Sequence, residues 1–173
     1  MKKPLKDTPA RRRALSAVII GSALLSTAAC ASTAAVDPAP NAADPECAEV
    51  MLALPESIGD HDLRQTDSQS TAVWGEPAAA VVRCGVQPPG PSTEHCVSAD
   101  GVDWLSVEEG ENWRLTSYGR EPTVEVVLDV ERVASSTAMV SVGPAVENIE
   151  QDRTCTAVEQ EIEETEDEVD VSE

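Results

Sequence analysis

The sequence predicts an α+β fold, in which a small antiparallel sheet of about four to five strands is covered by an N-terminal and a C-terminal helix and held together by disulfides. Three observations predict it. A helical apolar stripe comes first, several β-rich segments separated by turn residues follow, and a second helical pattern comes last. The folded domain is expected to span residues 44–156.

The first helix is expected directly after Asp44, which can cap its N-terminus, with Pro45 in its first turn. Pro55 is expected to end it. Its apolar residues recur at spacings of three and four and form one stripe: Cys47, Val50, Met51 and Leu54. Because Cys47 lies on this stripe, a structural disulfide is favoured there over a reactive thiol.

Residues 56–73 are polar and are expected to form loops, and β-rich segments follow them. The expected strands are Ala78–Val86, His95–Ser98, Val102–Val107, Trp113–Tyr118 and Thr123–Glu131. Asp100-Gly101 is a hairpin signal. In the last strand, apolar and acidic residues alternate, with Val124, Val126, Leu128 and Val130 on one side and Glu125, Asp129 and Glu131 on the other. This alternation predicts a sheet with one face in water.

The last helix is expected after Ser135 and Ser136, which are possible caps. Apolar residues then recur with helical spacing: Ala138, Val142, Ala145, Val146 and Ile149. Gly143-Pro144 interrupts this pattern, and proline inside a helix costs about 3 kcal/mol. A kink or a fresh start is therefore expected at Pro144.

Residues 1–29 have the anatomy of a signal peptide. A basic segment, 1–13, precedes an apolar run, 14–25, that is too short to span a membrane, and small residues then lead to Cys30. The expectation is export, followed by attachment of diacylglycerol to the Cys30 sulfur on the outer face of the cell membrane. The alternative is cleavage after Ala29 without lipid.

The segments on either side of the expected domain, and the net charge of the chain, limit the classes of partner that it can bind. Residues 30–43 are rich in Ala and Pro and are expected to form a tether, whereas 157–173 form an acidic tail that is expected to be disordered. After residue 30 the chain carries six basic and 31 acidic residues, a formal charge of −25. Such a surface repels phosphate backbones, so nucleic-acid binding is not expected.

The five cysteines are an odd number, and assigning Cys30 to lipid leaves an even set: Cys47, Cys84, Cys96 and Cys155. Disulfides suit an oxidising compartment. Three pairings are possible, and the favoured one joins Cys84 to Cys96 and Cys47 to Cys155. Free buried thiols are the alternative.

Several short motifs resemble a group of small actinobacterial lipoproteins known as a domain of unknown function. The matching residues are Trp74-Gly75-Glu76-Pro77, Arg83-Cys84-Gly85-Val86, Gly101-Val102-Asp103-Trp104 and Tyr118-Gly119-Arg120, together with Cys47 and Leu54-Pro55. The resemblance implies membrane association in a high-GC Gram-positive organism. It implies no activity.

Candidate site residues come from the scarce arginines and tryptophans and the acids near them: Arg83, Arg120, Glu76, Asp103, Trp74 and Trp104. Guanidinium groups can pair bidentately with carboxylates, either internal ones or those of a ligand. An internal salt-bridge network around core tryptophans is favoured over a ligand site.

No motif for a cofactor, a metal site or catalysis is present. His61 and His95 are interpreted as loop and structural residues, since no third ligand has suitable spacing. The expected function is therefore a non-enzymatic interaction or binding module of the cell envelope, with an unknown envelope protein or cell-wall component as partner. A small envelope hydrolase and a structural envelope component are the alternatives.

Overall fold

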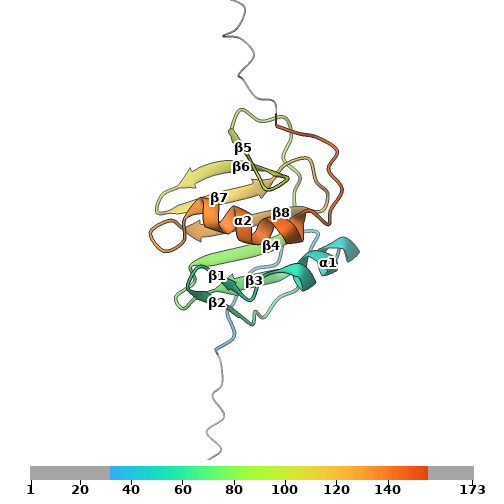
Figure 1. Cartoon of the computed structure of the whole chain (residues 1–173). Helices are drawn as coiled ribbons and strands as arrows, with labels where there is room; N and C mark the ends of the chain where they lie inside the picture. The colour runs from blue at the N-terminus through green and yellow to red at the C-terminus, as the bar shows by residue number, and fades with distance from the viewer. Residues whose placement is uncertain (1–31, 156–173) are drawn as a thin grey trace, which may run out of the picture. The chain divides into compact units, whose positions relative to one another are not determined.

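A computed structural model describes residues 32–155 and places in them an eight-stranded antiparallel sheet and two helices (Figure 1). The expected signal peptide, the Cys30 lipid site and the acidic tail at 157–173 lie outside the described residues. The sheet order is β1-β2-β3-β4-β8-β7-β6-β5. The strands are β1 Ser57–Ile58, β2 His61–Arg64, β3 Thr71–Trp74, β4 Ala80–Val86, β5 His95–Ala99, β6 Val102–Glu109, β7 Asn112–Ser117 and β8 Thr123–Asp129.

The α+β class, the antiparallel pairing and the helices at both ends of the domain are confirmed, but the sheet is larger than predicted. Residues 56–73, expected to be loops, contribute β1, β2 and β3. β1 and β2 lack a clear alternation because they lie at the sheet edge, where exposed polar residues are tolerated. β3 is only four residues long, lies between β2 and β4, and has all four of its side chains buried, so it lacks the alternation of a strand with one face in water.

Helix α1 spans Pro45–Ala53 as predicted, and the Asp44 side chain accepts a hydrogen bond of 3.0 Å from the amide of Glu46. Helix α2 spans Ser135–Val146, with Ala134 at the N-cap and no side-chain cap. The expected fresh start at Pro144 is wrong, because the helix continues through this residue to Val146. Pro144 has no amide hydrogen to donate to the carbonyl of Val140, so the helix lacks one hydrogen bond there.

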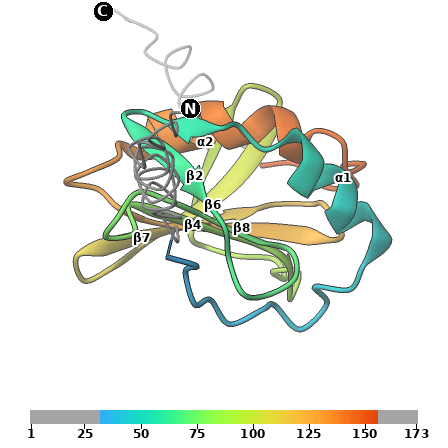
Figure 2. The same cartoon turned by 90° about the horizontal axis from the view of Figure 1, so that it is seen from below.

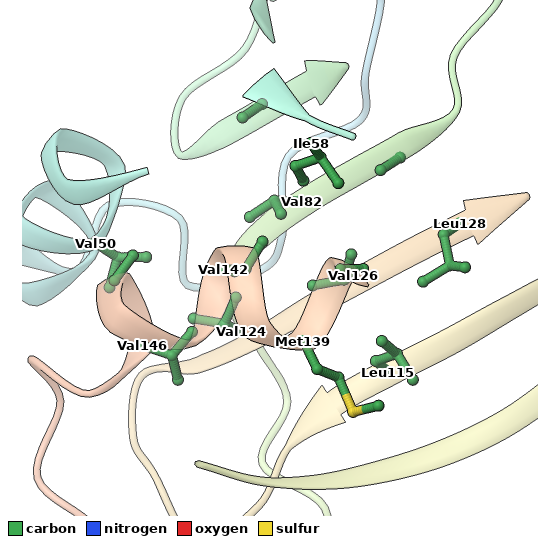
Figure 3. Packing of buried hydrophobic residues seen from close by; sticks show 14 of the residues in the cluster. Val50, Ile58, Val82, Leu115, Val124, Val126, Leu128, Met139, Val142 and Val146 are labelled. Carbon is green, nitrogen blue, oxygen red and sulfur yellow. The ribbon is translucent and has the colours of Figure 1, made fainter. Parts of the chain in front are cut away.

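Both helices pack on one face of the sheet (Figures 1 and 2). Valine and leucine side chains of β4, β7 and β8 meet those of α2 beneath the helix (Figure 3). Val124, Val126 and Leu128 are buried as the alternation predicted, but Val130 lies beyond β8 and is exposed. Glu125 also departs from the prediction, since it is buried rather than in water.

Residues 32–43, which we call the N-terminal strap, belong to the folded domain, so the expected domain start at Asp44 is too late. Figure 2 shows this blue segment on the face of the sheet opposite the helices. The amide of Asn41 donates to the carbonyl of Gly85 at 2.9 Å, and the Ser70 hydroxyl donates to the carbonyl of Ala42 at 2.6 Å. Ala39 and Ala42 are buried. Small side chains let the strap lie close to the sheet. The same Ala- and Pro-rich composition is typical of a free tether, so composition alone does not distinguish the two.

All four remaining cysteines form disulfides, but the favoured pairing is wrong. Cys47 of α1 is joined to Cys84 of β4, and Cys96 of β5 is joined to Cys155. The prediction favoured a short local loop, but Cys84 lies in the core on the central strand β4, and Cys96 lies on the edge strand β5. The pairing therefore follows the sheet order, which places β5 four strands away from β4.

Candidate functional site

The two candidate tryptophans are core residues. Trp74 and Trp104 are fully buried, and the Trp74 indole donates a hydrogen bond of 3.1 Å to the carbonyl of Pro55. The indole nitrogen of Trp104 is buried with no hydrogen-bond partner within the described residues. Neither ring offers a surface for stacking a ligand, so both contribute to packing.

Arg83 forms an ion pair with Glu125, not with the expected Glu76 or Asp103. The two residues face each other directly across β4 and β8, and the shortest nitrogen–oxygen distance is 2.6 Å. Both Nε and Nη2 donate to the same carboxylate oxygen. Glu125 is only 7% exposed at its side chain, whereas Arg83 is 33% exposed. The pair therefore neutralises a carboxylate that the sheet buries, which is a structural role.

Arg120 is buried and fastens the segment after α2 to the rest of the domain. Its guanidinium donates to the carbonyls of Ile149 and Gly101 and to the side-chain oxygen of Gln151. Burial lowers the pKa of Arg120, while the nearby carboxylates of Glu147 and Asp103 act in the opposite direction. A guanidinium suits this position because its donors form a fixed planar fork.

Asp103 holds the end of the described chain. Its carboxylate accepts hydrogen bonds from the Ser98 hydroxyl, from the side-chain amide of Gln151 at 3.0 Å and from the backbone amide of Cys155 at 2.7 Å. Gln151 thus bridges Arg120 and Asp103. We call Asp103, Arg120, Gln151 and the Cys96–Cys155 disulfide the C-terminal clasp.

Glu76 lies at the other end of the domain, in the turn between β3 and β4. It forms an ion pair of 3.6 Å with Arg64 and accepts a hydrogen bond of 3.1 Å from the Ser32 hydroxyl. Arg64 also donates to the carbonyl and the hydroxyl of Ser32. Glu76 and Arg64 therefore fix the start of the N-terminal strap.

The two histidines are far apart. His61 begins β2 and lines a surface hollow of about 360 Å³ together with Arg132 and Thr137, whereas His95 begins β5 at the opposite sheet edge. No group of three or more possible metal ligands occurs within residues 32–155. The six predicted site residues do not form one site. Arg120 and Asp103 meet in the C-terminal clasp, whereas the two tryptophans lie in the core, Arg83 pairs with Glu125, and Glu76 lies at the start of the strap.

Sequence reasoning missed the partners that these residues use: Glu125, Gln151, Arg64 and Ser32. Glu125 carried a signal, because it lies between Val124 and Val126 in a strand rich in valine. Arg64 stands in a stretch that was taken for a loop, and Gln151 and Ser32 are ordinary polar residues whose partners depend on the tertiary fold.

In the part of the chain that the structure describes, no helix is long and apolar enough to cross a membrane. The fold and these contacts define a small α+β protein with two disulfides, in which buried polar side chains fasten both chain ends to the sheet. The chain belongs to the DUF3515 family, described as proteins of unknown function, whose model matches residues 13–155. This confirms the resemblance to a domain of unknown function. No curated protein and no solved structure matches the chain.

Proposed function

We propose that this protein is an exported lipoprotein, anchored through Cys30 to the outer face of the cell membrane. The observation that carries the proposal is the use of the cysteines. The four cysteines other than Cys30 are joined in two disulfides, so Cys30 alone has no cysteine partner in the chain. Disulfides persist in oxidising compartments, which agrees with export. The signal-like segment that ends at Cys30 supplies the route.

We propose further that the domain is a non-enzymatic interaction module of the cell envelope. The arginines, acids and tryptophans that were candidates for a ligand site are engaged in packing and internal bonds. This arrangement supports a rigid scaffold whose surface, rather than a catalytic pocket, meets a partner. An envelope protein or a cell-wall component is the proposed partner.

Metabolic labelling with radioactive palmitate tests the anchor. The wild-type chain should be labelled and should fractionate with membranes, and the Cys30→Ala variant should lose both properties. A Cys96→Ala/Cys155→Ala variant is the matched control, since it also loses cysteines but should keep the label. Undiminished labelling of Cys30→Ala would end the lipoprotein proposal.

Co-sedimentation with purified cell-wall polymer tests one class of partner. Because Trp113 is the only tryptophan of the described chain that is not fully buried, its fluorescence is the available optical reporter. Saturable binding, competed by soluble wall fragments, is the expected result for a cell-wall module. Hydrolysis of the polymer by the purified protein would instead support the envelope-hydrolase alternative.

A further inference from the structure

The start of the N-terminal strap is held by many bonds at one edge of the sheet. Arg64 and Glu76 hold Ser32. The amide of Ala34 then donates to the carbonyl of Gln65 at 2.8 Å, and the amide of Asp67 donates to the carbonyl of Ala34 at 3.1 Å. These two bonds form a short parallel bridge beside β2. The first described residues are thus part of the sheet edge.

This attachment leaves little free chain between the domain and the proposed lipid. Only residue 31 separates Cys30 from Ser32, and two residues span at most roughly 7 Å. If residues 30–43 were a free tether, their root-mean-square length would be roughly 20 Å. The headgroup layer on each side of a bilayer is roughly 6 to 7 Å thick. The attachment of Ser32 therefore keeps its sheet edge within about one headgroup layer of the anchor.

The same edge carries an apolar groove. A hollow of about 380 Å³ lies between α1 and β2 and is lined by Met51, Leu54, Leu63 and Ala72, with Arg64 and Thr66 among its polar residues. Arg64 is also the residue that holds Ser32. Of these lining residues, Leu63 is a large apolar side chain that is 41% exposed. Large apolar side chains in water next to a lipid anchor can lower their free energy by entering the interfacial region.

From these observations we infer that the sheet edge formed by Ser32, Arg64, Glu76 and Leu63 lies against the outer leaflet, with the groove between α1 and β2 in contact with lipid. The inference rests on the proposed lipidation of Cys30. The exposed acids Glu56 and Asp62 lie close to Leu63 in the sheet and disfavour anionic headgroups, so the lipid that fits is one without net charge.

The opposite edge then faces away from the membrane. Six strand spacings separate β2 from β5, which corresponds to roughly 30 Å. The Cys96–Cys155 disulfide attaches the end of the described chain to β5. In Figure 1 the blue strap and the red C-terminal segment accordingly lie at opposite ends of the sheet. The surface available to an envelope partner is the one around β5 and the C-terminal clasp.

Depth-dependent fluorescence quenching tests the orientation. The full mature lipoprotein is placed in phosphatidylcholine vesicles that carry a quencher on the lipid headgroup, and a fluorescent amino acid is introduced at Asp62 or, as the matched control, at His95. Both positions are exposed: Asp62 lies on β2, next to the edge strand β1, and His95 lies on the edge strand β5. Quenching at Asp62 should exceed that at His95 at least threefold. Equal quenching, or stronger quenching at His95, would overturn the inference.

Two further variants separate the steps. A twelve-residue Gly-Ser insertion between Cys30 and Ser32 should keep the protein on vesicles but abolish the difference between the two labels, and a retained difference would contradict the role of the short connection. Leu63→Ser, which changes an exposed residue of the groove, should reduce quenching at Asp62 by about half, and unchanged quenching would contradict lipid contact by the groove. Failure of the wild-type protein to float with vesicles would instead refute the lipid anchor itself.

Discussion

Removal of one disulfide at a time tests both the pairing and the energetics of the fold. The perturbations are Cys47→Ala/Cys84→Ala and Cys96→Ala/Cys155→Ala, each made with Cys30 replaced by serine. The bonds close loops with sequence separations of 37 and 59 residues. The chain-entropy relation gives about 4 kcal/mol of unfolding free energy for each loop. Total stabilities of domains are about 5 to 15 kcal/mol, so each variant should fold but unfold at lower urea concentration.

The two losses should differ because the bonds differ in burial. Cys47 and Cys84 are fully buried, whereas Cys96 and Cys155 are half-buried. Replacing the first pair also removes buried sulfur contacts, which should add about 1 to 2 kcal/mol to the loss. Urea unfolding followed by circular dichroism measures both values. A loss below about 1 kcal/mol in either variant would refute the chain-entropy argument.

A thiol count checks the pairing independently of stability. With Cys47–Cys84 and Cys96–Cys155, each double variant retains one intact disulfide and should show no free thiol in denaturant. With the pairing favoured from sequence, each double variant would break both bonds and leave two free thiols. Two thiols per chain would therefore refute the structure at these positions.

Three other substitutions test separate parts of the fold by urea unfolding. Leu115→Ala should cost about 3 kcal/mol because Leu115 is fully buried under α2, and a loss under 1 kcal/mol would contradict its place in the core. Arg83→Met should cost about 2 kcal/mol because it leaves the Glu125 carboxylate buried without its partner; this value is reduced for the partial exposure of Arg83. The double variant Arg83→Met/Glu125→Leu should recover most of this loss of stability, and no recovery would argue against the ion pair. Gly85→Ala should cost about 2 kcal/mol and expose the strap to proteolysis, since Gly85 has a φ of +90° and a Cβ there would lie 2.4 Å from the Asn41 carbonyl. Gly90→Ala is the control, because a Cβ at Gly90 meets open space. Equal protease resistance of the two variants would contradict the docked strap.

The sequence predicted the elements whose signals are local. The Asp44 cap and the apolar stripe of α1 depend on neighbours within a few turns, and the alternation in β8 reports a buried face directly. The helix continues through Pro144 because burial of Val142, Ala145 and Val146 on either side of it outweighs one missing hydrogen bond. Whether a proline breaks a helix or ends it is decided by packing beyond the local pattern.

The remaining features depend on contacts between distant segments. Small residues such as Ala39 and Ala42 suit both a free tether and a strap that packs closely, so their burial follows only from the sheet beneath them. Arg83 has several acids within reach of a sequence argument, and only the register of β4 with β8 selects Glu125. The disulfide pairing likewise required the strand order.

The two disulfide loops follow one another along the chain without overlap, because Cys84 precedes Cys96. A polypeptide that emerges N-terminus first presents both cysteines of the first loop before either cysteine of the second. The first loop can therefore be closed before either cysteine of the second loop is present. In a crossed or nested pairing, by contrast, both cysteines of one bond are never present before a cysteine of the other bond has also emerged.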